Sequence, residues 1–285
     1  MNLQVVPDDS ESVDSTLKRR IVTGLVLAPL AVAAVFLLPN LPFAILFAVI
    51  TGLAMYEWAG LVVANMRSTD RTAMVTLSFM AAFILGVIWL YFFATIQIEL
   101  IYLGLFVWVL ALGTLWFNQL GFNPFSTTPA LAGAGLIIGW AGWLAITMIQ
   151  ARPDGAWWIL WIFGIAWGAD VGAYFAGKSF GKTKLAPRIS PGKTWEGVAG
   201  GMLLAGSVCG IGVFLWQDQS WFWLLMTLNL IGLSVCGDLF ESFVKRQTGV
   251  KDSGSLLPGH GGMLDRIDSI LIVLPIVIVT LMLQG

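Results

Sequence analysis

The stretch PALAGAGLIIGWAGWLAITMIQ, residues 129–150, decides the fold class, because it carries no charged side chain over a length that can cross a bilayer. A helix needs about 20 apolar residues to span the roughly 30 Å hydrocarbon core of a membrane. About nine stretches come near that length: 21–39, 41–63, 72–95, 99–118, 129–150, 156–176, 197–217, 220–238 and 265–284. We therefore predict an all-α fold, a polytopic integral membrane bundle of about nine transmembrane helices.

The composition supports the same fold class. Of 285 residues, 58% are hydrophobic and 11% are charged, whereas about a quarter of a typical soluble chain is charged. The 14 Trp and 18 Phe are typical of helices that meet both hydrocarbon and headgroups. Cys209 and Cys236 lie in apolar stretches without metal-ligand spacing, so we expect neither a disulfide framework nor a zinc site.

The chain divides by polarity into three parts. Residues 1–20 form a polar N-terminal tail, residues 21–150 an N-terminal transmembrane region, and residues 151–285 a C-terminal transmembrane region. Two longer polar loops, 177–196 and 239–264, interrupt the last part, and chemistry is expected there. No repeat and no separate soluble domain is visible, so one helical membrane domain is the simplest organisation.

The basic residues predict the orientation, since loops on the cytoplasmic side of a membrane retain Lys and Arg. With nine spans and a cytoplasmic tail, every basic residue except Arg152 falls on the cytoplasmic side. We therefore expect both long loops to face the cytoplasm, where nucleotides are. The net charge of −1 does not itself favour a nucleic-acid partner, and we expect none.

The loop 177–196 has features of a phosphate-binding segment. Its five basic residues are interleaved with Gly, Ser and Thr, which can supply both charge and backbone N–H groups to a polyphosphate. Ser190-Pro-Gly-Lys193-Thr194-Trp-Glu196 stands directly before a span, where a helix N-terminus favours an anion. On charge alone, the alternative is a topology loop that touches anionic lipid headgroups.

The letters Gly172-Ala-Tyr-Phe-Ala-Gly177-Lys178-Ser179 fit the phosphate-binding P-loop pattern. A P-loop follows a buried strand, whereas these residues close an apolar span, so we expect no NTPase loop. Asp170 and Glu57 are ionisable residues inside predicted spans, where such groups usually face a polar cavity, a metal or a partner. We expect Asp170 to support the site, and Glu57 to reach the interface near Arg67 without a role in chemistry.

The strongest signal lies near the C-terminus. Asp238 with Glu241, and Asp265 with Asp268, are carboxylate pairs at i, i+3 spacing, so each pair shares one helix face. Like-charged carboxylates near a membrane call for a cation, and hard oxygen ligands favour Mg²⁺. His260 is the only histidine and lies among glycines; we expect it to donate to a phosphate or to hold the turn.

The run from Ser242 to Asp268 resembles the signature of phosphatidate cytidylyltransferases, also called CDP-diacylglycerol synthases. It contains S-x-hydrophobic-K-R, K-D-x-G, H-G-G and D-R-x-D in that order. The segments around Asp170 and from Ser190 to Gly197 also resemble blocks of that family, so the likeness covers roughly residues 167–270.

The resemblance implies that CTP and phosphatidate give CDP-diacylglycerol and pyrophosphate, with Mg²⁺ held near Asp238 and Asp265, in a bacterial inner membrane. A second or monovalent metal, a homodimer, the acyl-chain preference and the choice between CTP and dCTP stay open. The predicted catalytic residues are Asp238, Lys251, Asp252, Asp265 and Asp268. The predicted phosphate-binding residues are Ser190, Lys193, Thr194, Lys245, Arg246, His260 and Arg266. The predicted supporting residues are Asp170, Glu196 and Glu241.

Two other functions share part of this pattern. A secondary transporter of an anionic solute also uses charges inside a membrane, but it predicts midplane charges and inverted repeats, which are not seen. A CDP-alcohol phosphotransferase would carry a multi-aspartate motif that begins D-G-x-x-A-R, which is absent here. The transporter therefore remains the alternative to the transferase.

Overall fold

The computed structural model describes residues 26–66, 72–92, 96–216, 220–254, 256 and 261–284, apart from the side chains of residues 216 and 220. An apolar helix, Val26–Leu37, comes first. The other elements are α2 Asn40–Met66, α3 Thr72–Phe92, α4 Gln97–Phe117, the short η2 Asn118–Leu120, α5 Thr128–Gln150, α6 Gly155–Phe180, β1 Lys184–Ala186, β2 Ser190–Thr194, α7 Trp195–Trp216, α8 Ser220–Thr248 and α9 Leu264–Gln284. The predicted tail, residues 1–20, lies outside the described residues.

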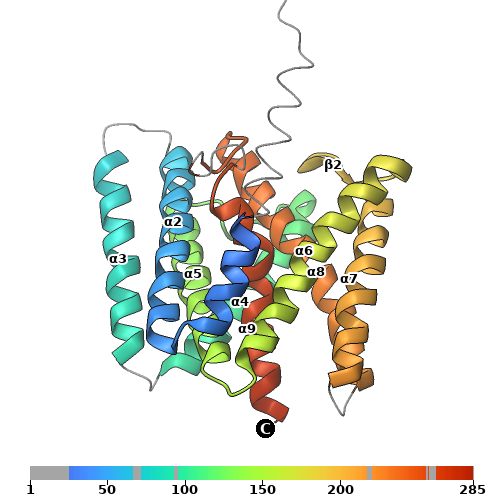
Figure 1. The fold of residues 1–285 in the computed structure, drawn as a ribbon. Coiled ribbons are helices and arrows are strands. Elements are labelled where there is room, and N and C mark those ends of the chain that lie inside the picture. The colour runs from blue at the N-terminus through green and yellow to red at the C-terminus, as the bar shows by residue number, and fades with distance from the viewer. Residues whose placement is uncertain are drawn as a thin grey trace, which may run out of the picture.

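The fold is an all-α membrane bundle, as predicted. Eight of the described helices are long and apolar enough to cross a membrane, and Val26–Leu37 is a shorter apolar helix. Successive helices run in opposite directions (Figure 1), so the end of α6, the start of α7, the end of α8 and the start of α9 share one end of the bundle. Within the described residues, every Lys and Arg except Arg152 lies at that end.

Two predicted loops are more ordered than the hydropathy pattern indicates. The loop expected at 239–264 begins only after Thr248, because α8 continues past the apolar segment. Glu241 and Lys245, at i, i+4 spacing, stabilise a helix after hydropathy has fallen. In the loop 177–196, α6 continues to Phe180, and β1 pairs antiparallel with β2 to form a hairpin.

Helices α6 and α7 pack through glycines. A Cβ atom on Gly172 would lie 2.5 Å from the carbonyl oxygen of Gly200, and one on Gly201 would lie 2.7 Å from that of Ala169. Such contacts are too short for real Cβ atoms, so these positions require glycine. Small residues let two backbones approach in a membrane, where helix association depends on close van der Waals contact. This contact between Ala169 and Gly172 on α6 and Gly200 and Gly201 on α7, called the α6–α7 seam below, places β2 and the start of α7 beside the end of α6.

Tryptophan indoles join neighbouring helices inside the bundle. The indole N–H of Trp143 donates to the carbonyl of Ala44 at 2.9 Å, and that of Trp108 donates to Leu271 at 3.2 Å. Trp58 and Trp140 likewise donate to carbonyls of α5 and α3. Because no water is available in hydrocarbon, an internal acceptor stabilises a buried indole N–H. The aromatic side chains are therefore part of the core as well as of the predicted interface belts.

The α6–α7 seam predicts a large cost for one added methyl group. In Gly200→Ala, the new Cβ would press on the Cβ of Ala176 and approach the Gly172 carbonyl oxygen to 2.8 Å. We expect a loss of about 1–3 kcal/mol of stability from overpacking, measured as a lower unfolding temperature in detergent. Gly212→Ala on the same helix meets nothing within 4 Å and should be neutral. Equal unfolding temperatures for the two variants would contradict the close packing of α6 on α7 at Gly200.

Candidate active site

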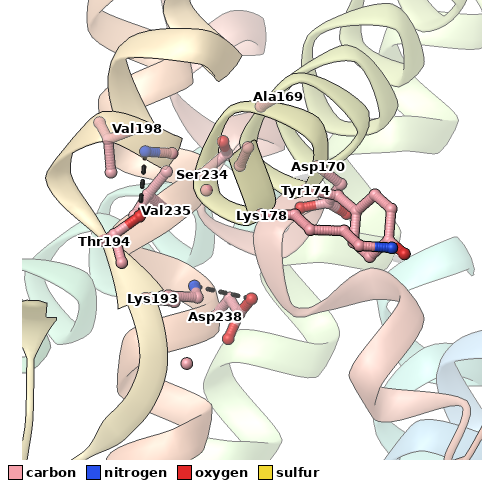
Figure 2. A pocket seen from close by; sticks show the side chains of 14 residues that line it. Ala169, Asp170, Tyr174, Lys178, Lys193, Thr194, Val198, Ser234, Val235 and Asp238 are labelled. Atoms are coloured by element: carbon pink, nitrogen blue, oxygen red, sulfur yellow. Dashed lines mark hydrogen bonds and ion pairs between the residues drawn. The ribbon is translucent and has the colours of Figure 1, made fainter. Parts of the chain in front are cut away.

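A pocket of about 400 Å³ lies between α6, α7, α8 and β2, at the end of the bundle where the basic residues gather. Its charged lining comes from Asp170 and Lys178 on α6, Lys193 on β2 and Asp238 on α8. Figure 2 shows these side chains, with Thr194 and Ser234, around the cavity. The lining brings together segments that are distant in the sequence, and their side chains carry both negative and positive charges.

The hairpin is tied to the start of α7 by hydrogen bonds. Both carboxylate oxygens of Glu196 accept from the backbone N–H of Thr183 at 3.1 Å, and the N–H of Trp195 donates to the Thr183 carbonyl at 2.9 Å. The Thr194 hydroxyl accepts from the N–H of Gly197 at 3.1 Å, as an N-cap residue does. Glu196 thus supports the hairpin, and Thr194 orders the helix N-terminus that faces the pocket.

Lys193 and Asp238 form the central ion pair of the pocket. The Lys193 Nζ lies 2.7 Å from the Asp238 Oδ2, and both side chains are partly exposed to the cavity (Figure 2). Ser242 donates to the other oxygen of Asp238 at 3.4 Å. Asp170 lies close enough that the charges of Asp238, Lys193 and Arg266 act on it. The pocket therefore holds two carboxylates, and the nearby cations offset part of their repulsion.

A second charged cluster surrounds Lys245. Its Nζ lies 2.6 Å from the Asp265 Oδ1 and 3.2 Å from the Glu241 Oε1. Glu241, Lys245 and Asp268 are all at most 9% exposed. The other oxygen of Asp265 accepts from the backbone N–H of Gly262 at 2.9 Å. Asp265 is therefore held from two sides at the first turn of α9.

The two clusters are neighbours because α8 and α9 approach at Gly237. A Cβ on Gly237 would lie only 2.7 Å from the carbonyl oxygen of Asp268. The charges of Asp238 and Glu241 consequently act on Asp268. Both predicted i, i+3 pairs thus contribute to one region, although Asp238 and Asp265 have different lysine partners.

The donor set suits a magnesium ion that also binds phosphate. Within the described residues, no three Asp, Glu, His or Cys side chains are arranged to hold a metal by themselves. Mg²⁺ commonly takes only one or two carboxylates and completes its shell with waters and substrate phosphates. Asp238 and Asp265, both partly exposed, fit that pattern.

The remaining predicted residues that the structure describes are spread over the same end of the bundle. Ser190 lies on β2, and the Arg246 Nε donates to the Ile189 carbonyl at 3.2 Å. Lys251 and Asp252 are exposed, and no contact with the pocket involves them among the described residues. His260 lies outside those residues. Positions 172–179 are helical, so they do not form the loop that a P-loop requires.

Sequence reasoning missed two contributors, Tyr174 and Glu57. Tyr174 lines the pocket from α6 beside Lys178, which was expected as one of the basic residues of the loop 177–196. The position of Tyr174 one turn beyond Asp170 was the available signal. Glu57 was expected at the interface near Arg67, but it is 3% exposed and contacts Ser253 and the start of α9. Its depth in a span was a signal that it needs internal partners.

The buried cluster predicts that Lys245→Met strongly destabilises the protein. The substitution keeps a long, unbranched side chain but leaves Glu241 and Asp265 without their cation. Removing one partner of a buried ion pair costs about 3–5 kcal/mol, which should lower the unfolding temperature in detergent. Lys184→Met, at an exposed cation on β1, is the control and should unfold like the wild type. A Lys245→Met variant as stable as this control would contradict the account.

Comparison with known proteins gives one consistent result. A model of the cytidylyltransferase family matches residues 18–284. A phosphatidate cytidylyltransferase of Pseudomonas aeruginosa is 37% identical over 263 residues, which cover 91% of this chain and 95% of that protein. Phosphatidate cytidylyltransferases of Haemophilus influenzae and Bacillus subtilis are each 35% identical, over 91% of this chain and 96% and 95% of theirs.

The matched region includes the hairpin, both charged clusters and every membrane-spanning helix that the structure describes. A match of this extent excludes a likeness confined to one short motif. The chain belongs to the cytidylyltransferase family.

Proposed function

We propose that this protein transfers a cytidylyl group from CTP to phosphatidate, giving CDP-diacylglycerol and pyrophosphate. The observation that carries the proposal is the Lys193–Asp238 pair, which lines a pocket at the end of an apolar helical bundle. A membrane-embedded site of this kind can meet a lipid from the bilayer and a nucleotide from water. The relatives named as phosphatidate cytidylyltransferases supply the substrate class.

The reaction makes one phosphorus–oxygen bond and breaks another. An oxygen of the phosphatidate phosphate attacks the α-phosphorus of CTP, and the bond to the β-phosphate oxygen breaks, so that pyrophosphate leaves with the electron pair. The second pKa of a phosphate monoester is near 6, so the nucleophile is already deprotonated at neutral pH. The protein therefore needs no general base, and its main task is to counter charge crowding.

The basic side chains of the pocket are placed for that task. Lys193 and Lys178 enter from two different elements and offer ammonium groups to phosphate oxygens. The N-terminus of α7, ordered by Thr194, adds a favourable field for an anion. Bound phosphates would compete with Asp238 for Lys193, since both are anions within reach of one flexible side chain.

We propose that Asp238 and Asp265 hold Mg²⁺ together with the substrate phosphates. Bound Mg²⁺ supplies charge neutralisation at the transferred and leaving phosphates. Lys245 and Gly262 would then orient Asp265, while Ser242 orients Asp238.

We also propose that the site end of the bundle faces the cytoplasm across a bacterial inner membrane. The support is the gathering of the described basic residues at that end, opposite Arg152. Within the fold, residues 151–285 would be the catalytic region and residues 21–150 its support. The homodimer remains a prediction.

The proposal predicts a lipid product from purified protein. Radiolabelled CTP should become a lipid-soluble cytidine compound in micelles that contain phosphatidate, and only with Mg²⁺ present. Added pyrophosphate should reverse the conversion, because the transfer exchanges one phosphoanhydride for another. A folded sample that forms no such product would contradict the proposal and favour the transporter.

The ion pair of the pocket predicts which hairpin lysine matters. In Lys193→Gln the phosphates lose a cation inside the pocket, and Asp238 loses its partner. We expect kcat/KM to fall by about 10²–10³-fold, as when one stabilising donor is removed from other active sites. Lys184→Gln removes an exposed charge from the same hairpin and should stay within about twofold of wild type. Equal losses in the two variants would show that only the overall charge of the hairpin counts.

A further inference from the structure

We infer that Glu57 of α2 is a positioning residue for Asp265, although it belongs to the N-terminal region and lies far from the pocket lining in sequence. Its carboxylate anchors Leu264 at the start of α9 and also binds Ser253, and so sets the orientation in which Asp265 is presented. The inference rests on the proposed function only for its effect on catalysis. The anchoring itself can be measured without substrate.

The contacts of Glu57 join three segments of the chain. Its Oε2 accepts from the backbone N–H of Leu264 at 2.8 Å and from the hydroxyl of Ser253 at 3.3 Å. These partners are 207 and 196 residues away in the sequence. Glu57 is only 3% exposed, so water does not compete strongly for the carboxylate. One side chain thus fixes both Ser253 and the first residue of α9.

Glycines on the facing segment leave room for this carboxylate. A Cβ on Gly254 would lie 2.6 Å from the Glu57 Cδ, and a Cβ on Gly262 would lie 2.9 Å from the same atom. Any other residue at these positions would collide with the Glu57 side chain. The backbone therefore closes around the carboxylate from both sides, which is the arrangement expected of an anchoring point.

The anchored atoms adjoin Asp265 directly. Leu264 begins α9 and Asp265 follows it, so the peptide group that Glu57 holds is next to that of Asp265. The Asp265 Oδ2 accepts from Gly262, whose backbone packs on Glu57. A shift of the α9 start would consequently move Asp265 relative to Lys245 and to the rest of the site.

The use of a carboxylate here exceeds what packing requires. An apolar side chain could fill the same volume without the cost of burying a charge. The α9 N-terminus and its free N–H groups offset part of that cost. The Glu57 Oε1 is buried and has no hydrogen-bond partner among the described residues. A buried carboxylate oxygen without a partner calls for an explanation, and the anchoring of the α9 start supplies one.

The test compares Glu57→Ala, Glu57→Gln and Trp58→Phe in full-length protein. Glu57→Ala removes the acceptor, so hydrogen exchange in peptides that cover residues 261–268 should rise by about tenfold or more. A displaced Asp265 should lower kcat by about 10–100-fold, while the KM for CTP changes less than about threefold. Glu57→Gln keeps a carbonyl oxygen for the Leu264 N–H and should restore most of the exchange protection and of kcat.

Trp58→Phe is the matched control, because it removes a buried hydrogen bond from the next residue of the same helix. It should lower the unfolding temperature but leave exchange at 261–268 and kcat near wild type. Wild-type exchange and kcat in Glu57→Ala would overturn the inference, as would equal effects in Trp58→Phe or no rescue by Gln. A wild-type protein without cytidylyl transfer would instead overturn the proposed function, and the exchange data would still decide the anchoring.

Discussion

The structure depends on one constraint, which is that each charge buried at this end of the apolar bundle must find a partner inside the protein. Lys193 meets Asp238, and Lys245 meets both Glu241 and Asp265. Because desolvation of an unpaired charge costs several kcal/mol, these pairs determine how α8, α9 and the hairpin are placed. The same cations are the ones that a polyphosphate would attract, so the groups needed for stability are also the groups available for chemistry.

Close backbone approaches make this pairing geometrically feasible. Apolar side chains gain little by leaving lipid for a protein interior, so the helices associate through contact and hydrogen bonds. Gly172 and Gly201 let α6 and α7 meet, and Gly237 lets α8 reach α9. The indoles of Trp108 and Trp143 add hydrogen bonds to carbonyls of neighbouring helices. The helices that carry the site consequently pack so closely that one added methyl group at these glycines would force them apart.

The role of Glu57 changes how the two halves of the chain are understood. Residues of the C-terminal half supply the ion pairs of the site, and the N-terminal half could be regarded as a membrane anchor. Glu57 instead reaches across the bundle to Leu264, beside Asp265. An N-terminal helix thereby takes part in shaping the C-terminal site. This arrangement agrees with a family match that extends over nearly the whole chain.

Sequence alone determined the all-α membrane fold and the approximate spans, because hydropathy is a local property of the chain. From local charge patterns it also predicted Lys193, Asp238, Lys245 and Asp265 as site residues. Tertiary structure decided that Lys193 pairs with Asp238 and Lys245 with Asp265, and that Glu57 is buried against α9. Those partners are distant in sequence, so which of them meet is decided only when the helices pack, and glycine contacts let the helices approach closely enough.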